Sequence, residues 1–175
     1  MTDSMTRISL ADGIELDVLD TGPKEAETLI FLHGFPENHR TWRHQIAHFS
    51  DRFRCIAPDQ RGYAGSSKPQ EVDAYSIDRL MGDIAGMADA LGVGKFTLVG
   101  HDLGGVVAWA MALKGVLADR MERLVIANAP HPLILSKLLY THPDQRAASQ
   151  YIRAFRDRSD RFGARLSQYF EGNRK

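Results

Sequence analysis

Cysteine, long apolar runs and an excess of either charge are all scarce in this 175-residue sequence. The single Cys55 excludes an internal disulfide framework and any metal site built from several cysteines. No apolar run approaches the roughly 18 residues of a membrane-spanning helix, so we expect a cytoplasmic protein without a membrane partner. The 22 basic and 22 acidic residues balance, with no basic block that could follow a phosphate backbone, which argues against nucleic acid as a partner.

The pattern of apolar residues predicts an α/β fold. Apolar and polar residues alternate loosely from Arg7 to Leu19, on both sides of a turn signal at Ala11-Asp12-Gly13. This pattern indicates two antiparallel strands. From residue 28 onward, predicted strands alternate with predicted helices, which is typical of a mostly parallel sheet flanked by helices. The strands are expected at Thr28–Leu32, Phe53–Ala57, Lys95–Val99 and Arg123–Ala127, and the helices at Ile77–Leu91 and Leu103–Lys114.

The alternation stops after Pro130-His131-Pro132. Leu133 to Gly163 has helical character with an interruption near Thr141-His142-Pro143, and no further strand follows. We therefore divide the chain into an α/β core over residues 1–130 and the beginning of a helical cap over residues 131–175.

The segment Val99-Gly100-His101-Asp102-Leu103-Gly104-Gly105 carries the strongest chemical signal. An apolar strand leads into Gly100 and a helix follows Gly104, which is the strand, sharp turn and helix context of the elbow pattern Gly-x-nucleophile-x-Gly. Asp102 occupies the nucleophile position, so a serine esterase is excluded. A carboxylate is ionised at neutral pH and can displace a leaving group from a saturated carbon to form an ester. The alternative is that Asp102 only caps the following helix, for which aspartate is a favoured residue.

The elbow and two further motifs, taken in their order along the chain, resemble those of the epoxide hydrolase and haloalkane dehalogenase branch of the α/β-hydrolase superfamily. Besides the elbow, His33-Gly34-Phe35-Pro36 resembles the oxyanion loop of that branch, and residues 59–67 resemble its Asp-x-Arg-Gly-x-Gly-x-Ser loop with one residue of latitude. Asn128-Ala129-Pro130-His131-Pro132 also resembles the segment that enters the cap. The resemblance implies an α/β-hydrolase fold in which the Asp102 carboxylate attacks the substrate carbon.

The resemblance also assigns the oxyanion hole and the proton donor. The backbone N–H groups of Phe35 and Leu103 would bind the oxygen on which charge develops when water attacks the Asp102 ester. His33 would support the loop rather than act as a base. Epoxide hydrolases of this branch protonate the epoxide oxygen with cap tyrosines, and Tyr151 resembles the first of these, with Tyr140 and Tyr169 as weaker candidates.

Dehalogenation is the alternative within the same enzyme class. Haloalkane dehalogenases usually place Trp after the nucleophile and Asn or Trp after the oxyanion-loop glycine, whereas this chain has Leu103 and Phe35 there. Fluoroacetate dehalogenases place arginines after the nucleophile, where this chain has Leu103 and Val106. The expected substrate is a small-molecule epoxide or alkyl halide, and the chemistry requires neither a cofactor nor a metal.

The catalytic acid and histidine that follow the nucleophile in this superfamily are not found in the sequence. His131 and His142 fall in the cap region, and Asn128 cannot serve as a carboxylate. We expect the last strands of the sheet to be missing and the sequence to be the N-terminal portion of a larger enzyme. The alternatives are a complementing C-terminal chain, a homodimer, or a non-catalytic small-molecule binding protein on the same scaffold.

Overall fold

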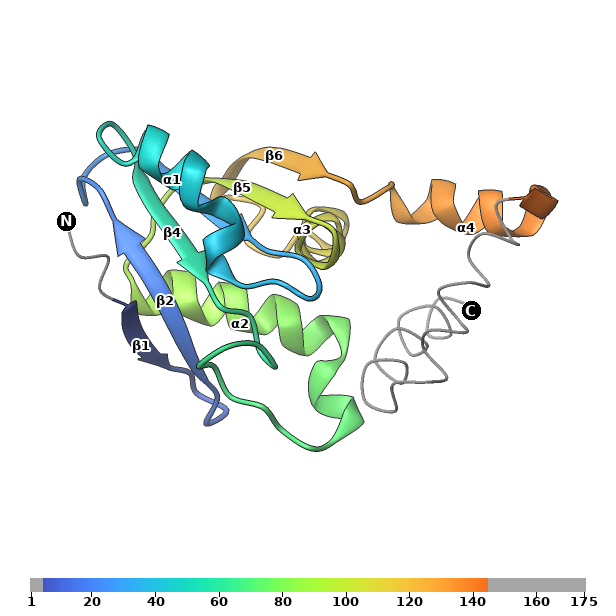
Figure 1. The fold of residues 1–175 in the computed structure, drawn as a ribbon, viewed down its shortest axis with the longest axis horizontal. Coiled ribbons are helices and arrows are strands. Elements are labelled where there is room, and N and C mark those ends of the chain that lie inside the picture. Colours follow the sequence, from blue (N-terminus) through green and yellow to red (C-terminus); the bar gives the residue numbers. More distant parts are fainter. Residues whose placement is uncertain (1–4, 145–175) are drawn as a thin grey trace. The chain divides into compact units, whose positions relative to one another are not determined.

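The computed structural model describes residues 5–144 of the chain. Their helices and strands form two compact units, one of residues 5–68 with 80–129 and the other of residues 69–79 with 130–144. The first unit contains a six-stranded sheet in the order β1-β2-β4-β3-β5-β6 (Figure 1). Its strands are β1 (Met5–Ser9), β2 (Glu15–Thr21), β3 (Thr28–Leu32), β4 (Arg54–Pro58), β5 (Phe96–His101) and β6 (Met121–Ala127).

The sheet is antiparallel at one side and parallel over the rest. Strand β2 runs antiparallel to both β1 and β4, whereas β3 pairs in parallel with β4 and β5, and β5 pairs in parallel with β6. The expected N-terminal hairpin and the mostly parallel sheet are both confirmed. Among the described residues, β6 forms the far edge of the sheet, where Val125 is half exposed.

Helices join the parallel strands and cover both faces. The helical elements of residues 5–144 are η1 (His39–Trp42), α1 (Arg43–Phe49), η2 (Val72–Tyr75), α2 (Ile77–Ala90), α3 (Leu103–Lys114) and α4 (Pro132–Thr141). The chain moves one way along the sheet from β3 to β4 and the other way from β4 to β5 and β6. Right-handed connections therefore place α1 on one face and α2 and α3 on the other.

The core consists of apolar side chains on both faces of the sheet. On the α1 face, Trp42 and Ile46 pack with strand residues that include Phe31, Cys55 and Val99. Cys55 is fully buried, and burial raises the pKa of its thiol to about 11, so the thiol stays protonated and inert at neutral pH. The opposite face contributes fully buried Ile30, Leu32, Ile56 and Leu98.

None of the helices in the described part of the chain has the length and apolar character needed to cross a bilayer. The second unit contains η2 and α4, and α4 ends at Thr141 with His142 as its C-cap, as the interruption near Thr141-His142-Pro143 predicts. The division into a core of residues 1–130 and a cap of residues 131–175 stays a prediction.

Candidate active site

A sharp turn between β5 and α3 presents Asp102. The strand ends at His101 and the helix begins at Leu103, so Asp102 alone makes the turn, with a left-handed φ of 49° and a ψ of −115°. The turn requires small neighbours, because a Cβ on Gly100 would lie 2.6 Å from the carbonyl oxygen of Gly104. The strand, turn and helix context predicted for Asp102 is confirmed.

The Asp102 side chain does not cap the helix that follows it. Its carboxylate makes no capping hydrogen bond to α3, and its Oδ1 instead accepts a hydrogen bond from the backbone N–H of Phe35 at 2.9 Å. No described residue donates a hydrogen bond to the other oxygen, Oδ2. The capping alternative is therefore wrong, and one carboxylate oxygen is held by a main-chain N–H from the loop after β3.

Of the two predicted oxyanion donors, Phe35 contacts the Asp102 carboxylate in the structure, and the role of Leu103 stays a prediction. Phe35 contacts it directly through its N–H, and Leu103 follows it in sequence as the first residue of α3. The N–H of the first residue of a helix has no partner within the helix, so it is available to an acceptor in front of it. The N–H of Gly104, by contrast, is already engaged with the carbonyl of His33 at 3.0 Å.

His33 is a fully buried residue of the loop after β3, and both of its ring nitrogens have hydrogen-bond partners. Its Nδ1 lies 2.8 Å from the carbonyl oxygen of Gly34, and its Nε2 lies 3.0 Å from the backbone nitrogen of Gln60. Burial lowers the pKa of His33, against the opposing effects of the Gly34 hydrogen bond and of the charges on Asp59 and Glu37. These contacts confirm the prediction that His33 forms hydrogen bonds that support its loop.

A second polar cluster, formed by Glu37, His101 and Asn128, lies beside the turn. Glu37 Oε2 accepts hydrogen bonds from the Gly34 N–H at 3.0 Å and from His101 Nδ1 at 3.1 Å. Asn128, which has a left-handed φ of 52°, reaches the other ring nitrogen of His101 at 3.4 Å. Burial alone would raise the pKa of Glu37, but the hydrogen bonds it accepts lower the pKa, so it is a carboxylate at neutral pH.

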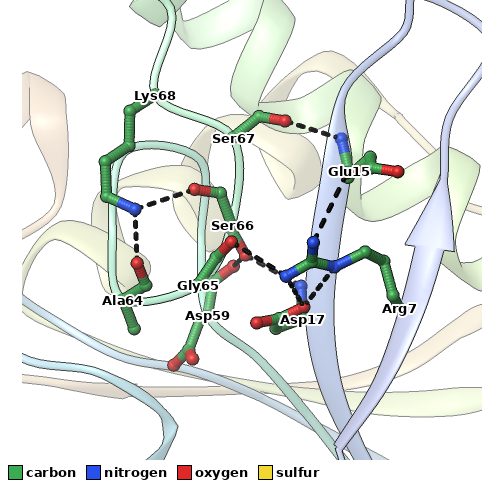
Figure 2. A network of polar contacts seen from close by, with 9 residues as sticks. All are labelled: Arg7, Glu15, Asp17, Asp59, Ala64, Gly65, Ser66, Ser67 and Lys68. Atoms are coloured by element: carbon green, nitrogen blue, oxygen red, sulfur yellow. Dashed lines mark hydrogen bonds and ion pairs between the residues drawn. The ribbon is translucent and has the colours of Figure 1, made fainter.

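The loop of residues 59–68 joins this region to the antiparallel side of the sheet (Figure 2). The Ser66 hydroxyl donates to the Asp59 carbonyl at 2.5 Å and accepts from the Asp17 N–H at 2.9 Å. The Ser67 hydroxyl accepts from the Glu15 N–H at 2.9 Å. The serines of this motif therefore fasten the loop to β2, which fixes the position of Gln60 near His33.

Arg61 from the same loop reaches helix α2. Its buried guanidinium donates to both carboxylate oxygens of Asp83, at 2.8 and 2.5 Å, and to Asp12 at 3.0 Å. The arginine of the motif thus serves structure rather than substrate binding.

Tyr151 and Tyr169 fall outside the described residues, and Tyr140 belongs to α4. Trp42 is buried in the core, and Trp109 Nε1 donates to the Ala129 carbonyl at 3.0 Å. Among the described residues, no group of three His, Cys, Asp or Glu side chains is arranged to hold a metal ion.

The sequence did not single out Glu37, His101 or Gln60 as parts of the site. Gln60 stands at a variable position of its motif and His101 at a variable position of the elbow, so neither motif assigns it a role. The signal that could have found them is position, since Glu37 and Gln60 each follow the end of a parallel strand, where binding residues gather in such sheets.

One strand of this mostly parallel sheet ends in a strained turn, and the carboxylate at that turn faces a main-chain N–H of a neighbouring loop. These features define the α/β-hydrolase class. The sequence agrees with this class. A model of the alpha/beta hydrolase fold family matches residues 27–173, and the chain belongs to that family.

The relatives within this family include epoxide hydrolases. The chain is 40% identical over 139 residues to epoxide hydrolase 1 of Caenorhabditis elegans, covering 79% of this chain and 34% of that protein. A solved structure described among novel epoxide hydrolases in metagenomes from hot environments is 68% identical with a TM-score of 0.83, covering 89% of this chain and 52% of that one. The Bacillus megaterium epoxide hydrolase in complex with an inhibitor is 36% identical with a TM-score of 0.79, covering 86% of this chain and 51% of that one. The chain thus spans about a third to a half of the length of these relatives.

Proposed function

We propose that this chain carries the nucleophilic half of an epoxide hydrolase active site, with Asp102 as the nucleophile. The observation that carries the proposal is the 2.9 Å hydrogen bond from the Phe35 N–H to Asp102 Oδ1 at a strained turn. The similarity to epoxide hydrolases supports the choice of an epoxide as substrate.

In the first step, Asp102 Oδ2 attacks a ring carbon of the epoxide. A carbon–oxygen ester bond forms, the ring carbon–oxygen bond breaks, and the ring oxygen keeps the electron pair and takes a proton from a cap tyrosine, for which we propose Tyr151. Because the Phe35 N–H holds Oδ1, the two carboxylate oxygens differ before the substrate binds. This arrangement orients Oδ2 toward the substrate and makes Oδ1 the carbonyl oxygen of the ester.

In the second step, water attacks the ester carbonyl carbon and negative charge develops on Oδ1. The N–H groups of Phe35 and Leu103 are proposed to stabilise that charge, after which the tetrahedral intermediate releases a diol and regenerates the carboxylate. The base that activates water would come from outside the described residues. A carboxylate ester that accumulates rather than turning over is the expected result if that base is lacking.

Intact-protein mass spectrometry tests this proposal. The chain is mixed with small epoxides and with matching alkyl halides, and the modified peptide is then mapped. An epoxide adds its whole mass to the protein, whereas a halide adds only its alkyl group and releases halide, so the two reactions are distinguished directly. We expect an epoxide adduct on the peptide that contains Asp102, together with diol if the ester turns over.

Two variants complete the test. Asp102→Asn should abolish the adduct, and Asp51→Asn should leave it unchanged, since the Asp51 side chain is largely exposed and remote in sequence from the turn. Adducts with alkyl halides alone would favour a dehalogenase instead. A folded chain that forms neither adduct nor diol contradicts the proposal and favours a non-catalytic binding protein.

A further inference from the structure

The peptide unit between Gly34 and Phe35 links the oxyanion loop to the reacting carboxylate. Its N–H is the Phe35 donor to Asp102 Oδ1, and its carbonyl oxygen belongs to Gly34. That oxygen is held at 2.8 Å by Nδ1 of His33 and at 3.2 Å by the N–H of Glu37. A peptide unit is planar, so its carbonyl and N–H turn together. Whatever holds the Gly34 carbonyl therefore also sets the direction of the Phe35 N–H.

Two contacts assign the tautomer of His33 independently. The backbone N–H of Gln60 can only donate, so His33 Nε2, 3.0 Å away, must be unprotonated. The Gly34 carbonyl can only accept, so Nδ1, 2.8 Å away, must carry the proton. Both requirements are met by the same neutral tautomer, in a ring that is completely buried.

Gln60 is held in place from both sides of this contact. Its side-chain amide donates to the backbone carbonyl of His33 at 2.6 Å, while its backbone N–H donates to the ring. Asp59 precedes Gln60, and its backbone carbonyl accepts a hydrogen bond from the Ser66 hydroxyl. The loop after β4 therefore presents a rigid donor to the histidine of the loop after β3.

We propose that His33, locked in its Nδ1–H tautomer by the Gln60 N–H, is a positioning residue that aims the Phe35 N–H at Asp102. This inference rests on the proposed function of Asp102 and deepens it. His33 does not touch the substrate. It acts through the Gly34–Phe35 peptide, and it couples the Asp59-to-Ser67 motif to the oxyanion hole.

Two substitutions distinguish the contributions of the two ring nitrogens of His33. In His33→Asn, the side-chain amide nitrogen stands at the position of Nδ1 and can still donate to the Gly34 carbonyl, but the acceptor for Gln60 is lost. In His33→Gln, the amide reaches the position of Nε2 and can accept from Gln60, but the donor to Gly34 is lost. A purely structural role for His33 would make the two variants similar, whereas the positioning role makes them differ.

Nitrogen-15 NMR and adduct kinetics on the full chain test the proposal together. In the wild type, the ring nitrogen shifts should show Nδ1 protonated and Nε2 unprotonated, and the Phe35 amide proton should shift when Asp102 is replaced by Asn. We expect His33→Asn to keep the Phe35 shift and an adduct rate within about threefold of wild type. His33→Gln should change the chemical shift of the Phe35 amide proton. It should also slow ester formation or hydrolysis on the order of tenfold to a hundredfold, which does not exceed the effect of removing a whole oxyanion donor.

Equal effects of the two variants, or an Nε2–H tautomer in the wild type, would overturn the inference. If His33→Gln does not fold, the wild-type tautomer and the rate of His33→Asn still decide, because a folded but inactive His33→Asn contradicts the positioning role. A wild-type chain that forms no adduct contradicts the proposed function instead. The tautomer of His33 and the chemical shift of the Phe35 amide proton would still test the hydrogen bonds from Gln60 through His33 to the Gly34–Phe35 peptide.

Discussion

Asp102 combines a strained backbone with a side chain turned away from the helix that it precedes. A non-glycine residue held at a positive φ is destabilised by about 1–3 kcal/mol, and the surrounding structure must compensate for it. An aspartate that served only as a helix cap would use an extended backbone and would bind the first turn of the helix. Asp102 does neither, and its Oδ1 binds the Phe35 N–H instead. These two departures support a chemical role for the residue.

The close approach of Gly34 to Asp102 gives a prediction at the residue scale. A Cβ on Gly34 would lie 2.6 Å from Asp102 Cβ and 2.9 Å from its Oδ1, so Gly34→Ala must displace the carboxylate. Because a misplacement of about 1 Å can slow a reaction on the order of a hundredfold, we expect adduct formation at Asp102 to fall by that order. Mass spectrometry after timed exposure to an epoxide measures the rate.

Gly82→Ala is the matched control for this variant. Gly82 lies within α2, and a Cβ there would meet nothing within 4 Å. Alanine should therefore stabilise the helix by roughly 0.5–1 kcal/mol and leave the adduct rate unchanged. Equal adduct rates in Gly34→Ala and wild type would show that the carboxylate does not need its present position.

At the scale of the elements, the sequence predicted helices with a continuous apolar stripe and overlooked those without one. The bounds of α3 match the prediction, and α2 agrees because its apolar residues recur at helical spacing. Helix α1 has seven residues, of which only Ile46 is buried, so it leaves no periodic pattern. The short η1 and η2 were overlooked for the same reason.

The candidate site was predictable only where a motif carries it. Asp102, Phe35 and Leu103 belong to contiguous motifs, so their residues could be assigned from the sequence. The relay through His33 and Gln60 joins residues 27 positions apart, and the contact between Glu37 and His101 joins residues 64 apart. Such contacts depend on which strands become neighbours in the sheet, and local patterns do not encode that.

The loop of residues 59–68 gives a prediction at this scale. Ser66→Ala would leave the part-buried Asp17 N–H without its acceptor and the buried Asp59 carbonyl without the hydroxyl donor. Leaving buried polar groups unpaired costs about 1–3 kcal/mol, and we expect the free energy of unfolding to fall by that amount. Ser67→Ala should cost less than about 1 kcal/mol, because the Glu15 N–H is on an exposed residue and water can replace the hydroxyl. Urea denaturation measures both, and equal losses would show that Ser66 has no special role in fastening the loop.

Across the whole molecule, the polar groups of the site converge at one end of the parallel strands. Glu37 follows β3, Gln60 follows β4, Asp102 follows β5 and Asn128 follows β6. In open α/β sheets, ligands bind outside the carboxyl ends of the strands, because the loops there come from different strands and meet. The alternation of strands and helices therefore implies that polar groups gather at this end of the sheet, and the elbow motif identifies the strand that leads to Asp102.

The buried neutral His33 gives the folded chain a pH dependence of stability. Its pKa is lowered by burial, while the Gly34 hydrogen bond and the charges of Asp59 and Glu37 oppose the shift and His39 adds to it. In the unfolded chain, histidine takes up a proton near its ordinary pKa of about 6.5. As the pH falls through that value, the unfolded state therefore takes up a proton more readily than the folded state, and stability decreases.

This contribution is present in full above the unfolded pKa of His33 and is lost as the pH falls toward its folded pKa. Carboxylates such as Asp20, whose pKa the ion pairs lower against an opposing effect of burial, lose their stabilisation only at more acidic pH, below their ordinary value of 3.8. Urea unfolding at several pH values measures the slope, to which one proton contributes at most about 1.4 kcal/mol per pH unit. The slope between about pH 7.5 and 5.5 should be shallower in His33→Asn than in wild type, since the other histidines are common to both chains. Identical slopes would mean that His33 takes up a proton equally in both states, which is incompatible with a Nε2 that accepts from Gln60 throughout this range.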